Sequence, residues 1–145
     1  MSSTASLSSA SPVARPRLRT ALLLVAGIAV AAGANAIVAT TALAVGADPA
    51  FRPLTPALFI SFGAAGLLAG YIGWRAIRRF VPNPRRALTI IVPIALVLSW
   101  VPDVVLMATG FILGASVTGV VGLMLMHPIV VAVGVPLYQR VAPVR

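Results

Sequence analysis

Residues 62–100 read FGAAGLLAGYIGWRAIRRFVPNPRRALTIIVPIALVLSW: two apolar stretches joined by a short turn rich in arginine and proline. The arginines of this turn are Arg75, Arg78, Arg79, Arg85 and Arg86. A helix needs about 20 apolar residues to cross a hydrocarbon core of roughly 30 Å. We therefore interpret the stretch as two membrane-spanning helices that form a hairpin around a short charged loop.

The same pattern continues on both sides of this hairpin. Apolar runs cover residues 20–46, 54–74, 87–105 and 118–138, in a chain of 145 residues that is 60% hydrophobic and 9% charged. This composition lies outside the range of soluble domains, and four spans leave no room for one. The sequence predicts an all-α fold, a transmembrane antiparallel four-helix bundle. We expect a disordered basic tail over residues 1–19 and a short tail over residues 139–145.

The distribution of arginine predicts the orientation of these spans. All eleven basic residues are arginine, and ten of them fall on one side of the predicted spans. The other side holds Arg52 and the two acids, Asp48 and Asp103. Because basic residues near span ends stay in the cytoplasm, we expect both termini inside a bacterial plasma membrane. The arginines behind the net charge of +9 are then expected to contact anionic lipid headgroups at the cytoplasmic face, and nucleic-acid binding is not expected.

The first span has a second interpretation. Its arginines, its apolar run and the sequence Ala34-Asn35-Ala36 imitate a signal peptide with its cleavage site. However, the apolar character continues to Val45, which is longer than a signal peptide needs. We favour an uncleaved span, and cleavage stays the alternative.

Glycine recurs regularly in the second span. Spacings of three, four and three residues place these glycines along one helix face: Gly63, Gly66, Gly70 and Gly73. Glycine allows helix backbones to approach closely, which favours association in lipid. We expect this face to pack against the first span, and a dimer seam is the alternative. Leu67 and Leu68 are expected to point away from the face.

Three polar residues fall within or beside the spans, where they are costly to place: Asn35, Asp103 and His127. They form the candidate intramembrane polar site. His127 has Asn35, Asp103 or a backbone carbonyl freed by a proline as possible partners, and Pro128 frees the carbonyl of Met124. The structural interpretation is an interhelical hydrogen bond that fixes packing; the functional one is a ligand, proton or ion site.

The residue types exclude most catalytic and metal sites. The chain has no cysteine, no lysine, one histidine and two acids. This set cannot supply the ligands of a zinc site or a phosphate loop with its lysine. We expect no catalytic residue, no cofactor and no metal, and we do not expect an enzyme.

The chain resembles a family of small four-span bacterial membrane proteins, common in actinobacteria, that carries no assigned activity. Three motifs carry the resemblance: Gly-Trp-Arg-x-x-Arg-Arg at Gly73–Arg79, Arg-Arg-Ala-Leu-Thr at Arg85–Thr89, and Leu-Met-His-Pro-Ile-Val-Val at Leu125–Val131. It implies a four-helix membrane fold with a histidine inside the last helix.

Two functions remain open at this stage. The glycine face, the short loops and the few polar residues favour a non-enzymatic protein, an interaction or accessory subunit of a cell-envelope assembly. The alternative is a small oligomeric transporter or channel with its polar site at Asn35 and His127. The expected partners are the lipid bilayer, a second copy of the chain or another membrane protein.

Overall fold

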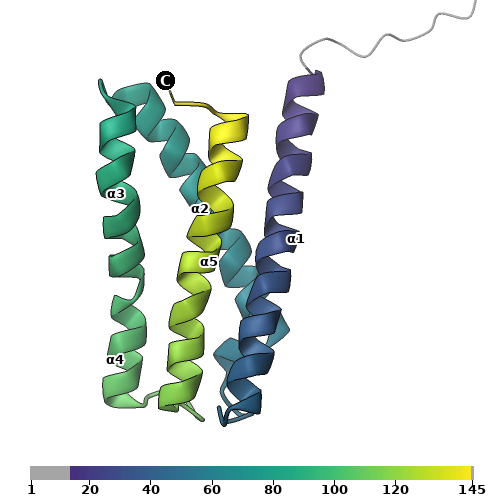
Figure 1. The fold of residues 1–145 in the computed structure, drawn as a ribbon, viewed down its shortest axis with the longest axis vertical. Coiled ribbons are helices and arrows are strands. Elements are labelled where there is room, and N and C mark those ends of the chain that lie inside the picture. The colour runs from purple at the N-terminus through teal and green to yellow at the C-terminus, as the bar shows by residue number, and fades with distance from the viewer. Residues whose placement is uncertain (1–13, 145) are drawn as a thin grey trace, which may run out of the picture.

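The computed structural model describes residues 14–144 (Figure 1). Its elements are α1 (Ala14–Ala44), η1 (Arg52–Leu54), α2 (Pro56–Phe80), α3 (Pro84–Ser99), α4 (Val101–Thr109) and α5 (Val117–Val141). Four stretches in this part of the chain are long and apolar enough to cross a membrane: Arg17–Ala44, Pro56–Phe80, Pro84–Thr109 and Val117–Val141. The predicted helical fold with four span-length helices is therefore confirmed.

Local chemistry explains where several helices begin and end. Proline occupies the start of α2 and α3, where the missing N–H has no helical partner to lose. The Asn83 side chain accepts a hydrogen bond from the Arg86 amide at 3.3 Å, and Ser116 caps α5 in the same way through Gly119 at 3.1 Å. Helix α4 ends at Gly110, whose φ of 62° is a left-handed conformation that glycine adopts without strain.

The helices are longer than the apolar runs. Helix α1 begins at Ala14, so the predicted disordered tail is wrong for residues 14–19, and residues 1–13 lie outside the described part. Helix α4 continues to Thr109 into the predicted outer loop, and α5 continues to Val141 into the predicted C-terminal tail. Hydropathy reports apolar length, whereas helical hydrogen bonding continues through polar residues such as arginine, a good helix former.

Figure 1 shows that the chain reverses direction after each span-length segment, so that α1 and α2 run in opposite directions, as do α4 and α5. The start of α1 and the C-terminal end lie at the same end of the molecule (Figure 1). Helix α5 is central, since it contacts α1, α2, α3, α4 and η1. Close approach to α1 depends on small residues: a Cβ on Gly122 would lie 2.9 Å from the Ala42 Cβ.

Two buried clusters fill the bundle, one toward each end. The first surrounds Phe51 and Val120 at the end that holds the loop between α1 and α2. The second surrounds Leu67 and Tyr138 near the opposite end. Leu67 is wholly inaccessible, and its Cδ2 would lie 3.1 Å from a Cβ on Gly134 of α5. It therefore packs toward the same helix as Gly66 and Gly70, and the expectation that it points away from the glycine face is wrong.

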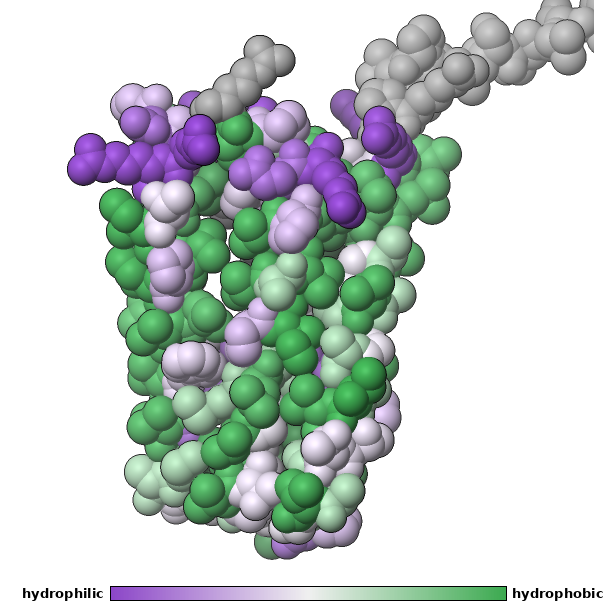
Figure 2. Space-filling view, in the orientation of Figure 1, coloured by the Kyte–Doolittle hydropathy of each residue, from purple (hydrophilic) through white to green (hydrophobic). Residues whose placement is uncertain are grey.

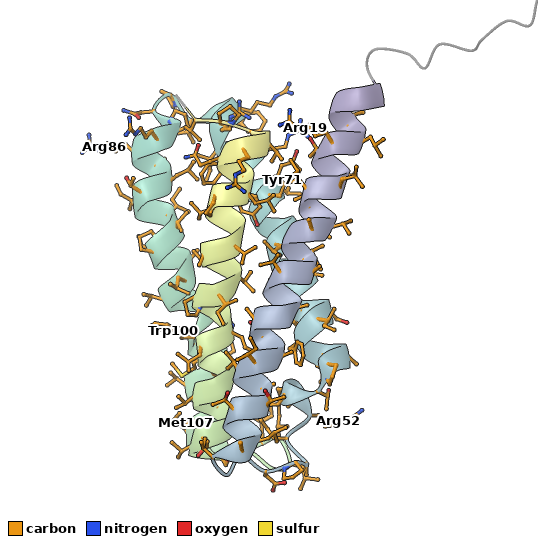
Figure 3. All side chains as sticks on the ribbon, turned by 45° about the vertical axis from the view of Figure 1, so that its right-hand side comes forward. Arg19, Arg52, Tyr71, Arg86, Trp100 and Met107 are labelled. Atoms are coloured by element: carbon orange, nitrogen blue, oxygen red, sulfur yellow. The ribbon has the colours of Figure 1, made fainter. Side chains whose placement is uncertain are left out.

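The lateral surface of the bundle is apolar. Large hydrophobic side chains stand exposed around it, including Phe62 at 74% and Ile72 at 67%. Figure 2 shows this apolar belt between a strongly hydrophilic upper end and a weakly polar lower end. Arg19 and Arg86 lie at the hydrophilic end and Arg52 at the opposite one (Figure 3). A surface of this kind has the polarity expected for contact with lipid.

Candidate functional site

Asp103 and His127 meet between α4 and α5. The His127 Nδ1 lies 3.5 Å from the Asp103 Oδ2 and 3.1 Å from the Leu123 carbonyl oxygen one turn earlier. Both neighbours are acceptors, so the hydrogen-bond network assigns the proton of the ring to Nδ1. The shorter contact is the hydrogen bond, and the longer one is an electrostatic contact between ring and carboxylate.

This pair is asymmetric in its surroundings. The Asp103 side chain is 7% exposed and the His127 side chain 30% exposed. The Asp103 Oδ2 is buried and accepts no hydrogen bond from the described residues. Asp103 occupies the first turn of α4, where the positive end of the helix dipole favours a carboxylate. The pair therefore combines a buried carboxylate oxygen that accepts no hydrogen bond from the described residues with a partly exposed imidazole.

Trp100 positions the two helices that carry this pair. It is the single residue between α3 and α4, at the point where Pro102 interrupts the hydrogen-bond ladder. Its indole Nε1 donates to the Met124 carbonyl oxygen at 3.0 Å. Pro128 has no N–H for that carbonyl, so the indole supplies the hydrogen bond that the helix cannot. Trp100 thus links the interruption at Pro102 to the carbonyl that Pro128 leaves without a donor in α5.

Asn35 lies apart from Asp103 and His127. It is 2% exposed and packs against α2, where a Cβ on Gly63 would lie 3.6 Å from its Nδ2. Its Oδ1 is buried and accepts no hydrogen bond within the described chain. No hydrogen bond or ion pair in residues 14–144 joins Asn35 to either other residue. The structure thus groups two of the three predicted polar residues.

The glycine face packs mainly against α5, and the predicted packing against the first span is wrong for most of it. A Cβ on Gly66 would lie 3.7 Å from Val130, and one on Gly70 would lie 2.7 Å from the Tyr138 hydroxyl. Gly63 faces α1 through Asn35 at 3.6 Å and also α5 through Val130 at 3.9 Å. Gly73 has no atom within 4 Å of its Cβ position among the described residues. Helix α5 is the partner because it occupies the centre of the bundle.

Aromatic hydrogen bonds across the bundle were not predicted. The Tyr138 hydroxyl donates to the Leu67 carbonyl at 2.6 Å, and the Trp74 indole donates to the Ala142 carbonyl at 2.9 Å. The rings of Tyr138 and Trp74 lie 5.7 Å apart. The sequence contained a partial signal for Trp100, because a proline-freed carbonyl needs a donor. It contained none for the other two, whose partners lie 71 and 68 residues away.

The donor set of this site does not suit a metal ion. Within residues 14–144, no group of three His, Cys, Asp or Glu side chains lies close enough to hold one. A single carboxylate and a single imidazole instead suit the holding or passing of a proton, or a structural contact.

Comparison with known proteins gives a family. No curated protein and no solved structure matches the chain. A family of unknown function, DUF6069, matches residues 12–144, which includes the four apolar helices and the Asp103–His127 pair. The chain therefore belongs to this family of unknown function, DUF6069.

Proposed function

We propose that this chain is a multi-pass protein of the bacterial plasma membrane that acts by interaction, as an accessory subunit of a cell-envelope assembly, and not as an enzyme. The filled interior carries the proposal. Leu67, Val120 and Phe51, which come from different helices and a loop, are each at most 1% exposed and occupy both halves of the bundle. A single copy packed in this way favours a structural scaffold over a conduit.

The apolar lateral surface supports the same role. Phe62 and Ile72 of α2 and Ile94 of α3 are more than half exposed, so these helices have area available for lipid or for another transmembrane helix. The loops between spans are short, which leaves the lateral surface as the largest area for a partner. Crosslinking in intact membranes before extraction in mild detergent should recover a defined partner in fixed proportion to this chain. Recovery of the chain alone would contradict the proposal.

The proposed orientation places the arginine-rich end in the cytoplasm. Eight arginines with described side chains belong to that end, at the start of α1, around the loop between α2 and α3, and near the end of α5, against Arg52 at the other. A phosphatase that works only outside the cytoplasm should be active when fused between residues 47 and 52 or between residues 110 and 116. It should be inactive when fused after Arg79 or at the C-terminus. Activity at the C-terminus would contradict the orientation.

The Asp103–His127 pair favours a second candidate function, proton transport by an oligomer. The open Oδ2 and the 30% exposed imidazole would let a proton pass between the pair and its surroundings. Liposomes with a trapped pH dye would then acidify faster with the protein than without it. An Asp103→Asn variant would abolish the difference. Equal acidification rates with the protein and with empty liposomes would exclude proton transport, and the accessory role would be the one candidate left.

A further inference from the structure

The arginine-rich end carries positive charge, and neither aspartate of the chain lies there to balance it. Both aspartates of the chain lie elsewhere: Asp48 in the loop after α1, and Asp103 in α4 against His127. The contact between Asp103 and His127 is the only one within residues 14–144 that joins an acidic and a basic side chain. The guanidinium groups at the hydrophilic end in Figure 2 therefore need anions from outside the chain.

Three of these arginines line an open surface hollow. Arg75, Arg78 and Arg79 have the i, i+3, i+4 spacing that places side chains on one helix face. Together with Ala76 they line a surface hollow of about 310 Å³ at the end of α2. Neighbouring guanidinium groups offer paired N–H donors that match the oxygens of a phosphate.

Two of these arginines lie over aromatic rings. The Arg75 guanidinium lies 5.9 Å from the centre of the Tyr71 ring, and the Arg79 guanidinium lies 5.7 Å from that of Phe80. Tyr71 is itself 6.0 Å from Tyr138, whose hydroxyl is bonded to Leu67 in the core. The contact with Tyr71 favours one placement of the Arg75 side chain, which lowers the entropy cost of binding, whereas Phe80 is 76% exposed and restrains Arg79 less.

The position of the hollow indicates the source of the phosphate. Exposed apolar side chains border it on α2, with Ile72 at 67% and Phe80 at 76%. Acyl chains would contact these residues while a headgroup reaches the guanidinium groups above them. A free phosphate ion would use none of this apolar surface.

We propose that Arg75, Arg78 and Arg79 form a specific binding site for the phosphate of an anionic glycerophospholipid. The inference rests on the membrane location in the proposed function. It adds one defined lipid position to the general attraction between arginine and anionic membranes.

The test is lipid binding by the full chain in a neutral detergent, followed by native mass spectrometry. The probes are dioleoylphosphatidylglycerol, dioleoylphosphatidylcholine and inorganic phosphate. Wild type is expected to bind phosphatidylglycerol in preference to phosphatidylcholine and to retain it in the presence of inorganic phosphate. Equal binding of both lipids, or displacement by inorganic phosphate, would overturn the proposal.

A matched pair of variants locates the site. Arg75→Gln with Arg79→Gln and Arg85→Gln with Arg86→Gln each remove two charges from the same end, but only the first pair lines the hollow. The first is expected to weaken phosphatidylglycerol binding about tenfold and the second less than about threefold. Equal weakening would overturn the proposal in favour of general electrostatic attraction.

Two further measurements keep the result interpretable. Arg75→Lys with Arg79→Lys keeps both charges, so it should retain more binding than the glutamine pair even if either pair lowers thermal stability. Binding in detergent does not depend on orientation in the cell. A reversed topology in the fusion assay would therefore contradict the proposed function and leave the lipid site standing. Loss of lipid preference with the expected topology would remove only the site.

Discussion

Gly70→Ala is expected to destabilise the protein by about 2 kcal/mol, although alanine is the better helix former. The new Cβ would lie 2.7 Å from the Tyr138 hydroxyl, which bonds to the Leu67 carbonyl at 2.6 Å. The hydroxyl lies between Gly70 and Gly134, where an added Cβ on Gly134 would be 2.9 Å from it. The ring would have to leave its buried position and give up this hydrogen bond. Thermal unfolding in detergent measures the effect.

Gly73→Ala is the matched control for this change. It lies on the same helix, three residues along, and its Cβ would meet no described atom within 4 Å. The substitution should be neutral or should stabilise the helix by a few tenths of a kcal/mol, up to about 1 kcal/mol. Tyr138→Phe removes the obstructing oxygen, so it should cost less in the Gly70→Ala background than in wild type. Similar losses for Gly70→Ala and Gly73→Ala would contradict this account of the glycine face.

His127→Leu is expected to cost about 2 kcal/mol, because it leaves the buried Asp103 carboxylate without its partner. The value is below that of a fully buried pair, since the His127 side chain is 30% exposed. Asp103→Leu should cost less, because His127 keeps its hydrogen bond to the Leu123 carbonyl. Unfolding of the purified protein in detergent gives both values.

A variant with both residues replaced measures the interaction energy between Asp103 and His127. With both residues replaced by leucine no buried charge remains, so the loss should be smaller than the sum of the single losses by about 1 kcal/mol or more. His127→Gln should behave more mildly than His127→Leu, because its amide can donate to Leu123 or Asp103. Additive losses would show that the contact at 3.5 Å between Asp103 and His127 adds nothing to the free energy of unfolding.

The hydrogen-bond partners of the polar and aromatic residues could be predicted only where a nearby residue in the sequence shows that a partner is missing. Pro128 marks the Met124 carbonyl as lacking its helical donor, and Trp100 supplies that donor from 24 residues away. Asp103 and His127 can be recognised in the sequence because polar side chains are costly to place in lipid. Contact between the two lowers this cost. Asn35 carries the same cost but lies beside Gly63 of α2, a neighbour that its own sequence does not mark.

The number of spans, the arginine-rich end and the sites of helix capping are determined by the sequence itself. Each depends on residues close together in the chain: about 20 apolar residues, a cluster of arginines or a proline beside an asparagine. The tertiary structure alone decided that Gly66 and Gly70 face α5 and that Tyr138 reaches Leu67 across 71 residues. In lipid, any two helices can bury small residues against each other, so the choice of neighbour follows from how all the helices fit together at once.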